Sequence, residues 1–170
     1  TFLAHGPVMQ SIVIHPYRPG IEREVVRLHA EYYAAHWAFD GRFAAQVKRE
    51  LAEFRAGFDA DRDGFWWAEA DGAFAGAVVV DGSRHGKGCA RLRWFIVDET
   101  VQGRGLGSAL IGRAMDFCRE RAFGSVHLWT FAGLHAARRL YERNGFVLVE
   151  EVPGDGWGPV VTEQKFELAR

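Results

Sequence analysis

The segment "VQGRGLGSAL" places a glycine at every second position, at Gly103, Gly105 and Gly107, directly before apolar residues with helical spacing. Glycine loses more conformational freedom on folding than any other residue, so three of them at the start of a helix need a reason. A helix N-terminus presents free backbone N–H groups and the positive end of the helix dipole, and it binds phosphate when the preceding chain lets the ligand come close. The segment therefore predicts either a tight strand-to-helix turn or a phosphate-binding loop from Gly103 to Ser108, with the charge of Arg104 nearby.

Two familiar phosphate-binding motifs do not describe this segment. A dinucleotide-binding G-x-G-x-x-G fingerprint would need glycine at the position of Ser108, and no Lys-Ser or Lys-Thr pair completes a P-loop. If the loop binds phosphate, it belongs to another class of phosphate-binding loop.

The composition and charge of the chain describe one folded domain. Its 170 residues are 48% hydrophobic and 25% charged, which is typical of a globular protein with a sizeable core rather than of a disordered segment. The 21 basic and 22 acidic side chains nearly cancel, so the chain lacks the broad positive field that holds nucleic acid or an anionic membrane. We therefore expect a single domain over residues 1–170, with no nucleic-acid or membrane partner.

Cysteine usage and the distribution of apolar residues indicate a cytoplasmic protein. Cys89 and Cys118 are too few for a disulfide framework and lack the spacing of a zinc site. No apolar run reaches the roughly 20 residues of a membrane span, and the first residues lack the pattern of a signal peptide. The chain begins at Thr1 rather than at Met, which is compatible with a trimmed or excised domain, and we expect residues 1–10 to form a flexible extension.

Hydrophobic periodicity predicts a succession of strands and helices in the order β-α-α-β-β-β-α-β-α-β-β. The pair Asp71-Gly72 predicts a hairpin turn, and Asn144-Gly145 predicts the end of the last helix. Helices are expected over residues 21–35, 42–58, 106–124 and 134–145, and strands over 11–20, 64–70, 73–82, 89–98, 125–131, 146–152 and 160–168.

Two motifs resemble hallmarks of the GNAT family of N-acetyltransferases. The pattern Gln102-x-x-Gly105-x-Gly107, which follows a predicted strand, is similar to the family's pyrophosphate-binding motif Q/R-x-x-G-x-G/A. The segment "RRLYERNGF" matches a second hallmark, L-Y-x-x-x-G-F, at the usual separation. The resemblance implies an α+β (α/β) fold, with a central mixed sheet of about seven strands, a splayed pair of parallel strands and about four flanking helices.

Two further stretches resemble acetyltransferase domains that are fused to MarR-type winged-helix regulators. These are residues 128–142 and 158–168. No winged helix is present in the chain, so this resemblance implies either a stand-alone relative or the acetyltransferase half of such a fusion. A homodimer and a MarR-type regulator are therefore candidate partners.

The resemblance implies acetyl-coenzyme A as the acetyl donor and an amine as the acceptor. In the family, the strand equivalent to residues 92–97 diverges from the next parallel strand, and the pantetheine amides pair with its open edge. The residues expected to contact the cofactor are Phe95, Ile96, Val97, Gln102, Gly103, Arg104, Gly105, Leu106, Gly107 and Ser108. Many members also contact the cofactor through an asparagine seven residues before the tyrosine of the second motif, where this chain has Leu134.

The tyrosine of the second motif, Tyr141, is the expected general acid, since in the family it lies near the thioester sulfur and a phenol is a reasonable proton donor to a leaving thiolate. The general base is not evident, because Trp129 stands where some relatives have a glutamate. A water relay remains open, as do four side chains, namely Glu31, His36, His127 and His135.

The acceptor pocket is expected between the first two helices and the diverging strands. Tyr33, His36 and Trp37 would close it and Trp129 would face it, since aromatic faces suit a cationic amine before it loses its proton. The same aromatic residues could instead belong to the core. His29 and His36 could share a helix face, but no third ligand is evident and we expect no metal site.

Three functions remain open on this evidence. The first is transfer of an acetyl group from acetyl-coenzyme A to a small-molecule amine, the second is non-catalytic sensing of acyl-coenzyme A, and the third is acetylation of a peptide N-terminus. The first two functions both need Gly105 and Gly107, whereas only the first needs Tyr141 and an open acceptor pocket. The third would need a groove that takes an extended chain. We favour the first function.

Overall fold

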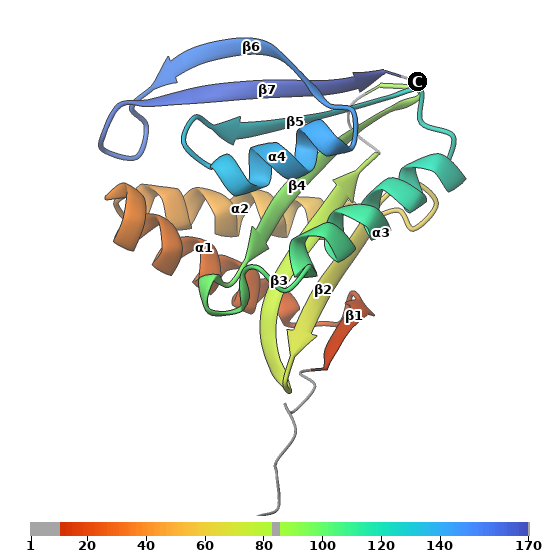
Figure 1. Cartoon of the computed structure of the whole chain (residues 1–170), viewed down its shortest axis with the longest axis horizontal. Coiled ribbons are helices and arrows are strands. Elements are labelled where there is room, and N and C mark those ends of the chain that lie inside the picture. Colours follow the sequence, from red (N-terminus) through yellow and green to blue (C-terminus); the bar gives the residue numbers. More distant parts are fainter. Residues whose placement is uncertain (1–10, 83–85, 170) are drawn as a thin grey trace, which may run out of the picture.

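The computed structural model of the chain describes residues 11–82 and 86–169 (Figure 1). Every strand and helix predicted from the periodicity is present in the predicted order, with one short 3₁₀ helix in addition. The extension expected at residues 1–10 lies outside the described residues. The elements are β1 (Ile12–Pro16), α1 (Ile21–Trp37), α2 (Gly41–Ala56), β2 (Gly64–Ala70), β3 (Ala73–Asp81), β4 (Cys89–Val97), η1 (Glu99–Val101), α3 (Leu106–Glu120), β5 (Ser125–Phe131), α4 (His135–Arg143), β6 (Val147–Gly154) and β7 (Val161–Ala169).

The strands form one mixed sheet of seven strands in the order β1-β2-β3-β4-β5-β7-β6. The pair β4–β5 is parallel and all other neighbours are antiparallel. The hairpin predicted between β2 and β3 is confirmed, since Asp71 (φ 52°) and Gly72 (φ 83°) both adopt positive φ, as a two-residue type I′ turn requires. The fold class predicted from the resemblance is therefore confirmed.

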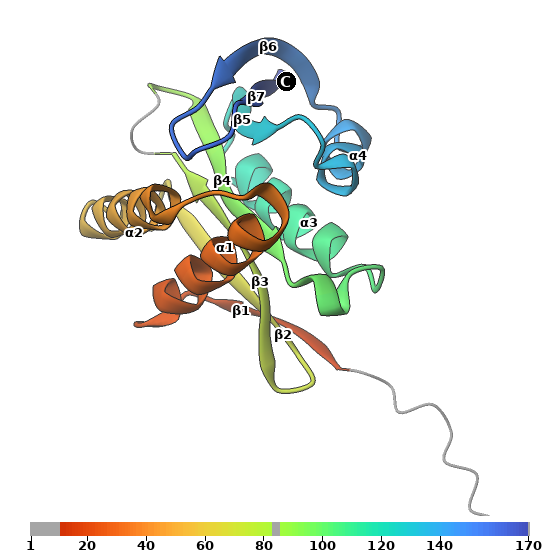
Figure 2. The ribbon, with the colours of Figure 1, turned by 90° about the vertical axis from the view of Figure 1, so that its left-hand side faces the viewer.

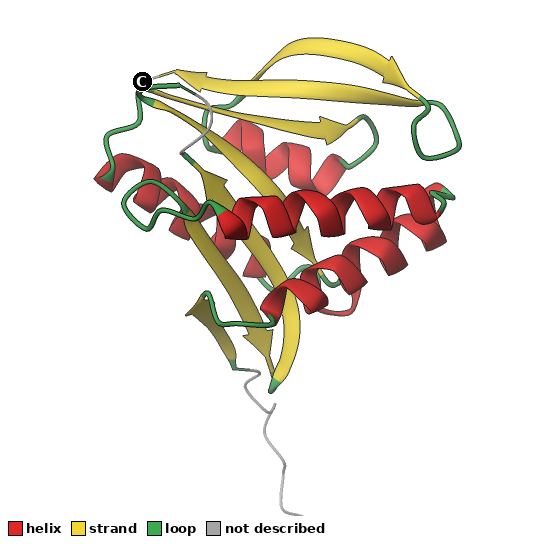
Figure 3. Cartoon of the chain, turned by 180° about the vertical axis from the view of Figure 1, so that it is seen from behind, coloured by secondary structure: helices red, strands yellow, loops and turns green. Residues whose placement is uncertain are grey.

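Helices cover both faces of the sheet, with α1 and α2 on one side and α3 and α4 on the other (Figures 2 and 3). Because side chains alternate along a strand, β3 contributes to two separate cores. Val78 and Val80 pack with α3, while Ala77 and Val79 pack with α1 and α2. This burial on both faces explains the continuous apolar run of β3, which shows little polar alternation.

The sheet opens in its middle, between β4 and β5. These strands pair only where Cys89, Ala90 and Arg91 face residues 125–127, and the described residues contain no further pair between them. A β-bulge lies farther along β4, where Val78 of β3 faces both Trp94 and Phe95 and where Trp94 adopts a φ of 47°. A bulge bends its strand and changes the direction of its side chains, so β4 turns away from β5 beyond the paired segment.

The ends of two helices show which residue sets a helix stop. Helix α4 ends as predicted, with Gly145 (φ 92°) just beyond it. Helix α3 ends at Glu120, before the expected Gly124, because Ala122 (φ 56°) takes the left-handed position and the Phe123 N–H bonds to the Cys118 carbonyl. Burial of the Phe123 ring holds alanine in a conformation that sequence patterns assign to glycine.

Gly76 of β3 lies against the backbone of β4 and provides a test of how tightly the two strands pack. A Cβ at this position would lie 2.6 Å from the Ile96 carbonyl oxygen, which belongs to the backbone and cannot rotate away. We expect Gly76→Ala to lower the free energy of unfolding by about 1–3 kcal/mol, measured by denaturant titration. Gly112→Ala is the matched control, since no atom lies within 4 Å of its Cβ and alanine favours the helix by about 0.5–1 kcal/mol. Equal stability of Gly76→Ala and the parent chain would contradict this close packing.

Candidate active site

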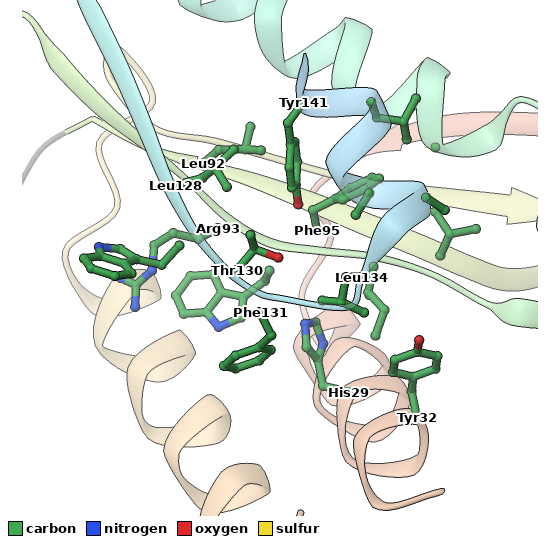
Figure 4. Close-up of a pocket in the computed structure, with 18 of the residues that line it drawn as sticks. His29, Tyr32, Leu92, Arg93, Phe95, Leu128, Thr130, Phe131, Leu134 and Tyr141 are labelled. Atoms are coloured by element: carbon green, nitrogen blue, oxygen red, sulfur yellow. The ribbon is translucent and has the colours of Figure 1, made fainter. Parts of the chain in front are cut away.

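A cleft of about 750 Å³ lies where β4 and β5 separate. Its walls come from β4 and β5, from α1 and α2 on one side of the sheet, and from the start of α3 and from α4 on the other side (Figure 4). Trp157, in the β6–β7 connection, and Glu163 of β7 complete the lining. The cleft therefore joins the predicted cofactor segment with the helices that were expected to surround the acceptor.

The glycine segment forms one end of the cleft. Gly103 (φ 85°) and Gly105 (φ 79°) adopt the left-handed conformation, and no atom lies within 4 Å of a Cβ built on either. Gly107 has another role, because its Cβ would lie 3.0 Å from a methyl group of Leu140 and 3.4 Å from the Phe95 ring. The first two glycines thus provide the turn and leave open space, whereas the third lets α3 approach α4 and β4.

The backbone at the start of α3 has free donors. The first hydrogen bond of α3 joins the Ala109 N–H to the Gly105 carbonyl at 3.0 Å, so the preceding N–H groups have no helical partner. Residues 105–108, which carry these donors, line the cleft together with Gln102 and Gly103. Arg104 does not line it, since its guanidinium lies 3.6 Å from the carboxylate of Asp71.

Tyr141 reaches from α4 into the cleft, and its oxygen points to the space beside Phe95 (Figure 4). Its ring packs against those of Phe95, Phe146 and Phe166, with centroids 6.0–6.1 Å apart. Its hydroxyl makes no hydrogen bond to any residue that the structure describes. Burial raises the pKa of Tyr141, so the phenol is protonated at neutral pH and is free to donate to a ligand.

The motif L-Y-x-x-x-G-F has a structural explanation in the end of α4. The N–H of Phe146 bonds to the Tyr141 carbonyl at 3.1 Å, and the N–H of Gly145 bonds to the Glu142 carbonyl at 3.0 Å. These two bonds form a Schellman motif, in which the apolar residue after the glycine commonly packs on the third residue from the helix end. Here that third residue is Tyr141, so the helix stop itself holds the tyrosine in place.

His29 of α1 lies buried in the lining of the cleft, with 6% of its surface exposed. Its Nδ1 lies 2.8 Å from the Val25 carbonyl, and because a carbonyl only accepts, Nδ1 carries the hydrogen and Nε2 keeps a lone pair. Burial lowers the pKa of His29 to about 4, so the ring is neutral at pH 7. The sequence interpretation considered His29 only as half of a metal pair, although its spacing of four residues from Val25 and from Tyr33 places it on the buried face of α1.

The four residues expected around the acceptor are divided between the cleft and its surroundings. Tyr33 and Trp129 line the cleft, and burial raises the pKa of Tyr33, which keeps its hydroxyl neutral. Trp37 packs behind them against Phe131, with ring centroids 5.7 Å apart, and His36 is exposed with its Nε2 2.8 Å from Glu99. The lining of the cleft therefore includes Tyr33 and Trp129, but not Trp37 or His36.

Among the residues considered as a general base, His135 lines the cleft from the start of α4. Glu31 is exposed on α1 and pairs with Arg27 at 3.0 Å, and neither Glu31 nor His127 lines the cleft. Leu134, which replaces the asparagine of many relatives, lines the cleft and is the N-terminal cap residue of α4, without a side-chain cap hydrogen bond.

Charged residues that the sequence interpretation missed line the cleft where β4 and β5 still pair. Arg93 bonds to Glu50 of α2 at 3.0 Å and to the buried Asp81 at 3.3 Å. Arg91, two residues earlier on β4, lines the same part of the cleft. The alternation Arg-Leu-Arg in β4 is the available signal, because it places Arg91 and Arg93 on one face and the buried Leu92 on the other.

The described residues contain no cluster of three or more His, Cys, Asp and Glu side chains that could hold a metal ion. None of the helices in the described part of the chain combines the length and apolar character needed to cross a bilayer.

Comparisons with known proteins agree with the motifs. A family model described as the acetyltransferase (GNAT) family matches residues 23–146. The chain is 30% identical over 127 residues to an uncharacterized N-acetyltransferase of Methanocaldococcus jannaschii, covering 72% of this chain and 56% of the relative. It is 30% identical over 156 residues to mycothiol acetyltransferase of Rhodococcus erythropolis, covering 82% of this chain and 48% of the relative. The chain thus spans about half the length of these curated relatives.

Solved structures share the fold at low sequence identity. An acetyltransferase of the GNAT family from Staphylococcus aureus superposes with a TM-score of 0.73 at 16% identity, covering 94% of this chain and 99% of the other. A Salmonella typhimurium protein described as an acetyltransferase, solved with its cofactor acetyl-CoA, superposes with a TM-score of 0.70 at 18% identity, covering 93% of each chain. The match over residues 23–146 includes both the glycine segment and Tyr141, and it shows that this chain belongs to the GNAT family of acetyltransferases.

Proposed function

We propose that this domain transfers the acetyl group of acetyl-coenzyme A to a primary amine of a small molecule, by direct attack in a ternary complex. The observation that carries the proposal is the placement of two features in one cleft. Residues 105–108, at the start of α3, and Tyr141, whose hydroxyl bonds to none of the described residues, all line the cleft between β4 and β5.

The cofactor is proposed to enter between the diverging strands. Its diphosphate would accept hydrogen bonds from the backbone around Gly105, and its pantetheine amides would pair with the edge of β4 at Phe95, Ile96 and Val97. Bound acetyl-CoA in the Salmonella structure of the same fold supports this assignment. The open space above Gly103 and Gly105 supports it independently.

The proposed reaction forms a C–N bond and breaks a C–S bond. The neutral amine adds to the thioester carbonyl carbon, the coenzyme A thiolate leaves, and Tyr141 donates its proton to the sulfur. The proton that the amine loses restores the phenol through solvent. Burial raises the pKa of Tyr141, and the same surroundings disfavour the thiolate anion, so the phenol remains a suitable donor.

Two residues on α1 are proposed to orient the amine. The lone pair on Nε2 of His29 accepts a hydrogen bond from an amine N–H, because Nδ1 is already bonded to the Val25 carbonyl. The neutral ring does not repel an incoming ammonium group, since burial lowers the pKa of His29 to about 4. The aromatic ring of Tyr33 forms the adjacent wall.

The free hydroxyl of Tyr141 favours an enzyme over a non-catalytic sensor of acyl-coenzyme A, because a sensor needs no proton donor at the thioester. The resemblance of residues 128–142 and 158–168 to domains fused to MarR-type regulators supports a further proposal, that the domain works together with such a regulator. This second proposal rests on that resemblance alone.

Gly105→Asn tests the phosphate-binding loop. Asparagine tolerates the left-handed conformation of Gly105, so the turn should persist, while the added side chain occupies the open space where the diphosphate is proposed to lie. We expect the Kd for acetyl-coenzyme A, measured by calorimetric titration, to rise at least about tenfold, the equivalent of one charge-assisted hydrogen bond. Gly20→Asn is the matched control, since Gly20 is also a left-handed N-terminal cap residue with nothing within 4 Å of its Cβ, at α1. Unchanged binding by Gly105→Asn would refute the loop assignment.

Tyr141→Phe tests the proton donor. The substitution keeps the ring and its packing on Phe95 and Phe146, so acetyl-coenzyme A affinity and Tm should hold. We expect kcat to fall about 10²- to 10⁴-fold, the usual contribution of a general acid. Tyr17→Phe removes a hydroxyl outside the cleft and should leave kcat unchanged. If Tyr141→Phe turns over as the parent does, another group or water supplies the proton.

His29 should make stability depend on pH. Its pKa is about 4 in the folded chain against 6.5 for a free histidine, so below pH 6.5 the unfolded chain binds a proton that the folded chain does not. The stability present above pH 6.5 should therefore fall as the pH drops towards 4, by up to about 3 kcal/mol. His29→Gln should flatten this part of the pH profile in denaturant titrations, whereas the exposed His135→Gln should not. An identical slope in His29→Gln and the parent chain would show that His29 is not held neutral.

A further inference from the structure

We infer that the acceptor amine carries a carboxylate, and that Arg91 binds this carboxylate in the part of the cleft where β4 and β5 still pair. The inference rests on the proposed acetyl transfer and names its substrate class. It starts from a cation in the cleft wall that forms no hydrogen bond or ion pair with residues 11–82 and 86–169.

Arg91 is the last residue of β4 that pairs with β5, opposite His127, and its side chain lines the cleft. It makes no hydrogen bond or ion pair with any residue that the structure describes, and its Nε is buried without a partner. Burial lowers the pKa of Arg91 to about 10, with the nearby charge of Arg93 as a second cause, and the guanidinium is still charged at pH 7.

The two carboxylates whose charges act on Arg91, Glu50 and Asp81, are already bonded to another cation. Arg93 takes Glu50 at 3.0 Å and Asp81 at 3.3 Å, and its guanidinium also lies 4.1 Å from the ring centre of Trp94. Glu50 and Asp81 attract Arg91 only through space, which helps it to stay charged. A partly buried guanidinium without bonded acceptors costs stability, because it has lost water contacts without replacing them. A carboxylate matches its two-pronged donor geometry.

Negative charges at two places in the cleft wall also limit the acceptor. Glu50 of α2 and Glu163 of β7, which lies opposite Phe131, both line the cleft, so an acceptor with several negative charges would meet repulsion. A molecule with one amine and one carboxylate fits this arrangement. Phe95, which packs against Tyr141, lies four residues beyond Arg91, at most about 13 Å along the strand, and the bulge at Trp94 shortens this distance. The arginine side chain covers part of that distance, which leaves room for an acceptor of the size of an amino acid or a short ω-amino acid.

The experiment compares matched acceptors that differ only in charge. Amino acids and ω-amino acids of increasing length are each paired with their amides, and kcat/KM is measured with saturating acetyl-coenzyme A. We expect the carboxylate of the best pair to exceed its amide by about 10- to 100-fold, as is typical for a hydrogen bond to a charged group. Arg91→Gln should remove this preference through KM and leave the Kd for acetyl-coenzyme A unchanged, while Arg91→Lys should keep part of it. Arg23→Gln, which removes an exposed arginine of α1, is the matched control.

The outcomes separate the two proposals. Equal kcat/KM for carboxylates and amides, or a preference that persists in Arg91→Gln, overturns the role of Arg91 and leaves acetyl transfer standing. If the parent chain binds acetyl-coenzyme A but acetylates none of the amines, the proposed enzyme activity is overturned. The carboxylate site at Arg91 is then tested by binding alone. The carboxylates but not the amides should raise the Tm of the parent chain, and equal Tm shifts would refute the site. If Arg91→Gln does not fold, Arg91→Lys and the paired acceptors on the parent chain decide in the same way.

Discussion

The architecture of this domain depends on how short the parallel contact between β4 and β5 is. In the part of the chain that the structure describes, the two strands share three register pairs, after which β4 pairs with β3 alone and β5 with β7 alone. The sheet thus remains continuous while its centre opens. Backbone groups along the two open edges need partners if they are to be shielded from water. The cleft therefore offers a row of backbone donors and acceptors before any side chain is considered, which suits a ligand that carries amides of its own.

The sequence predicts the fold best where one residue type determines the local backbone. Asp71-Gly72 and Asn144-Gly145 mark a hairpin and a helix end because Asp71, Gly72 and Gly145 adopt positive φ, which aspartate and glycine tolerate. The same reasoning misplaces the end of α3, where Ala122 adopts the left-handed conformation that a pattern search reserves for glycine. Burial of the neighbouring Phe123 outweighs the local preference there, and burial depends on the rest of the fold.

The lining of the cleft is harder to predict from the sequence, because the buried face of α1 both packs in the core and lines the cleft. His29 and Tyr33, one turn apart on α1, line the cleft, whereas Trp37, one turn farther, packs against Phe131 outside it. Periodicity identifies the face but not the point along the helix where the core ends and the cleft begins. An aromatic residue can therefore belong to the core and line the pocket at the same time. Tyr33 does both, since it is buried against Phe39 and Phe43 and also lines the cleft.

The end of α4 has a consequence for how this site tolerates change. Tyr141 is the third residue from the end of the helix, and the hydrogen bonds that locate it come from the N–H groups of Gly145 and Phe146. Its position thus depends on the C-terminal end of the helix and not on how the helix begins. Leu134, which stands where many relatives have asparagine, lies at the N-terminal end of α4 and does not affect these hydrogen bonds. The proposed proton donor and the cofactor contact expected at the start of α4 can therefore diverge separately over evolutionary time.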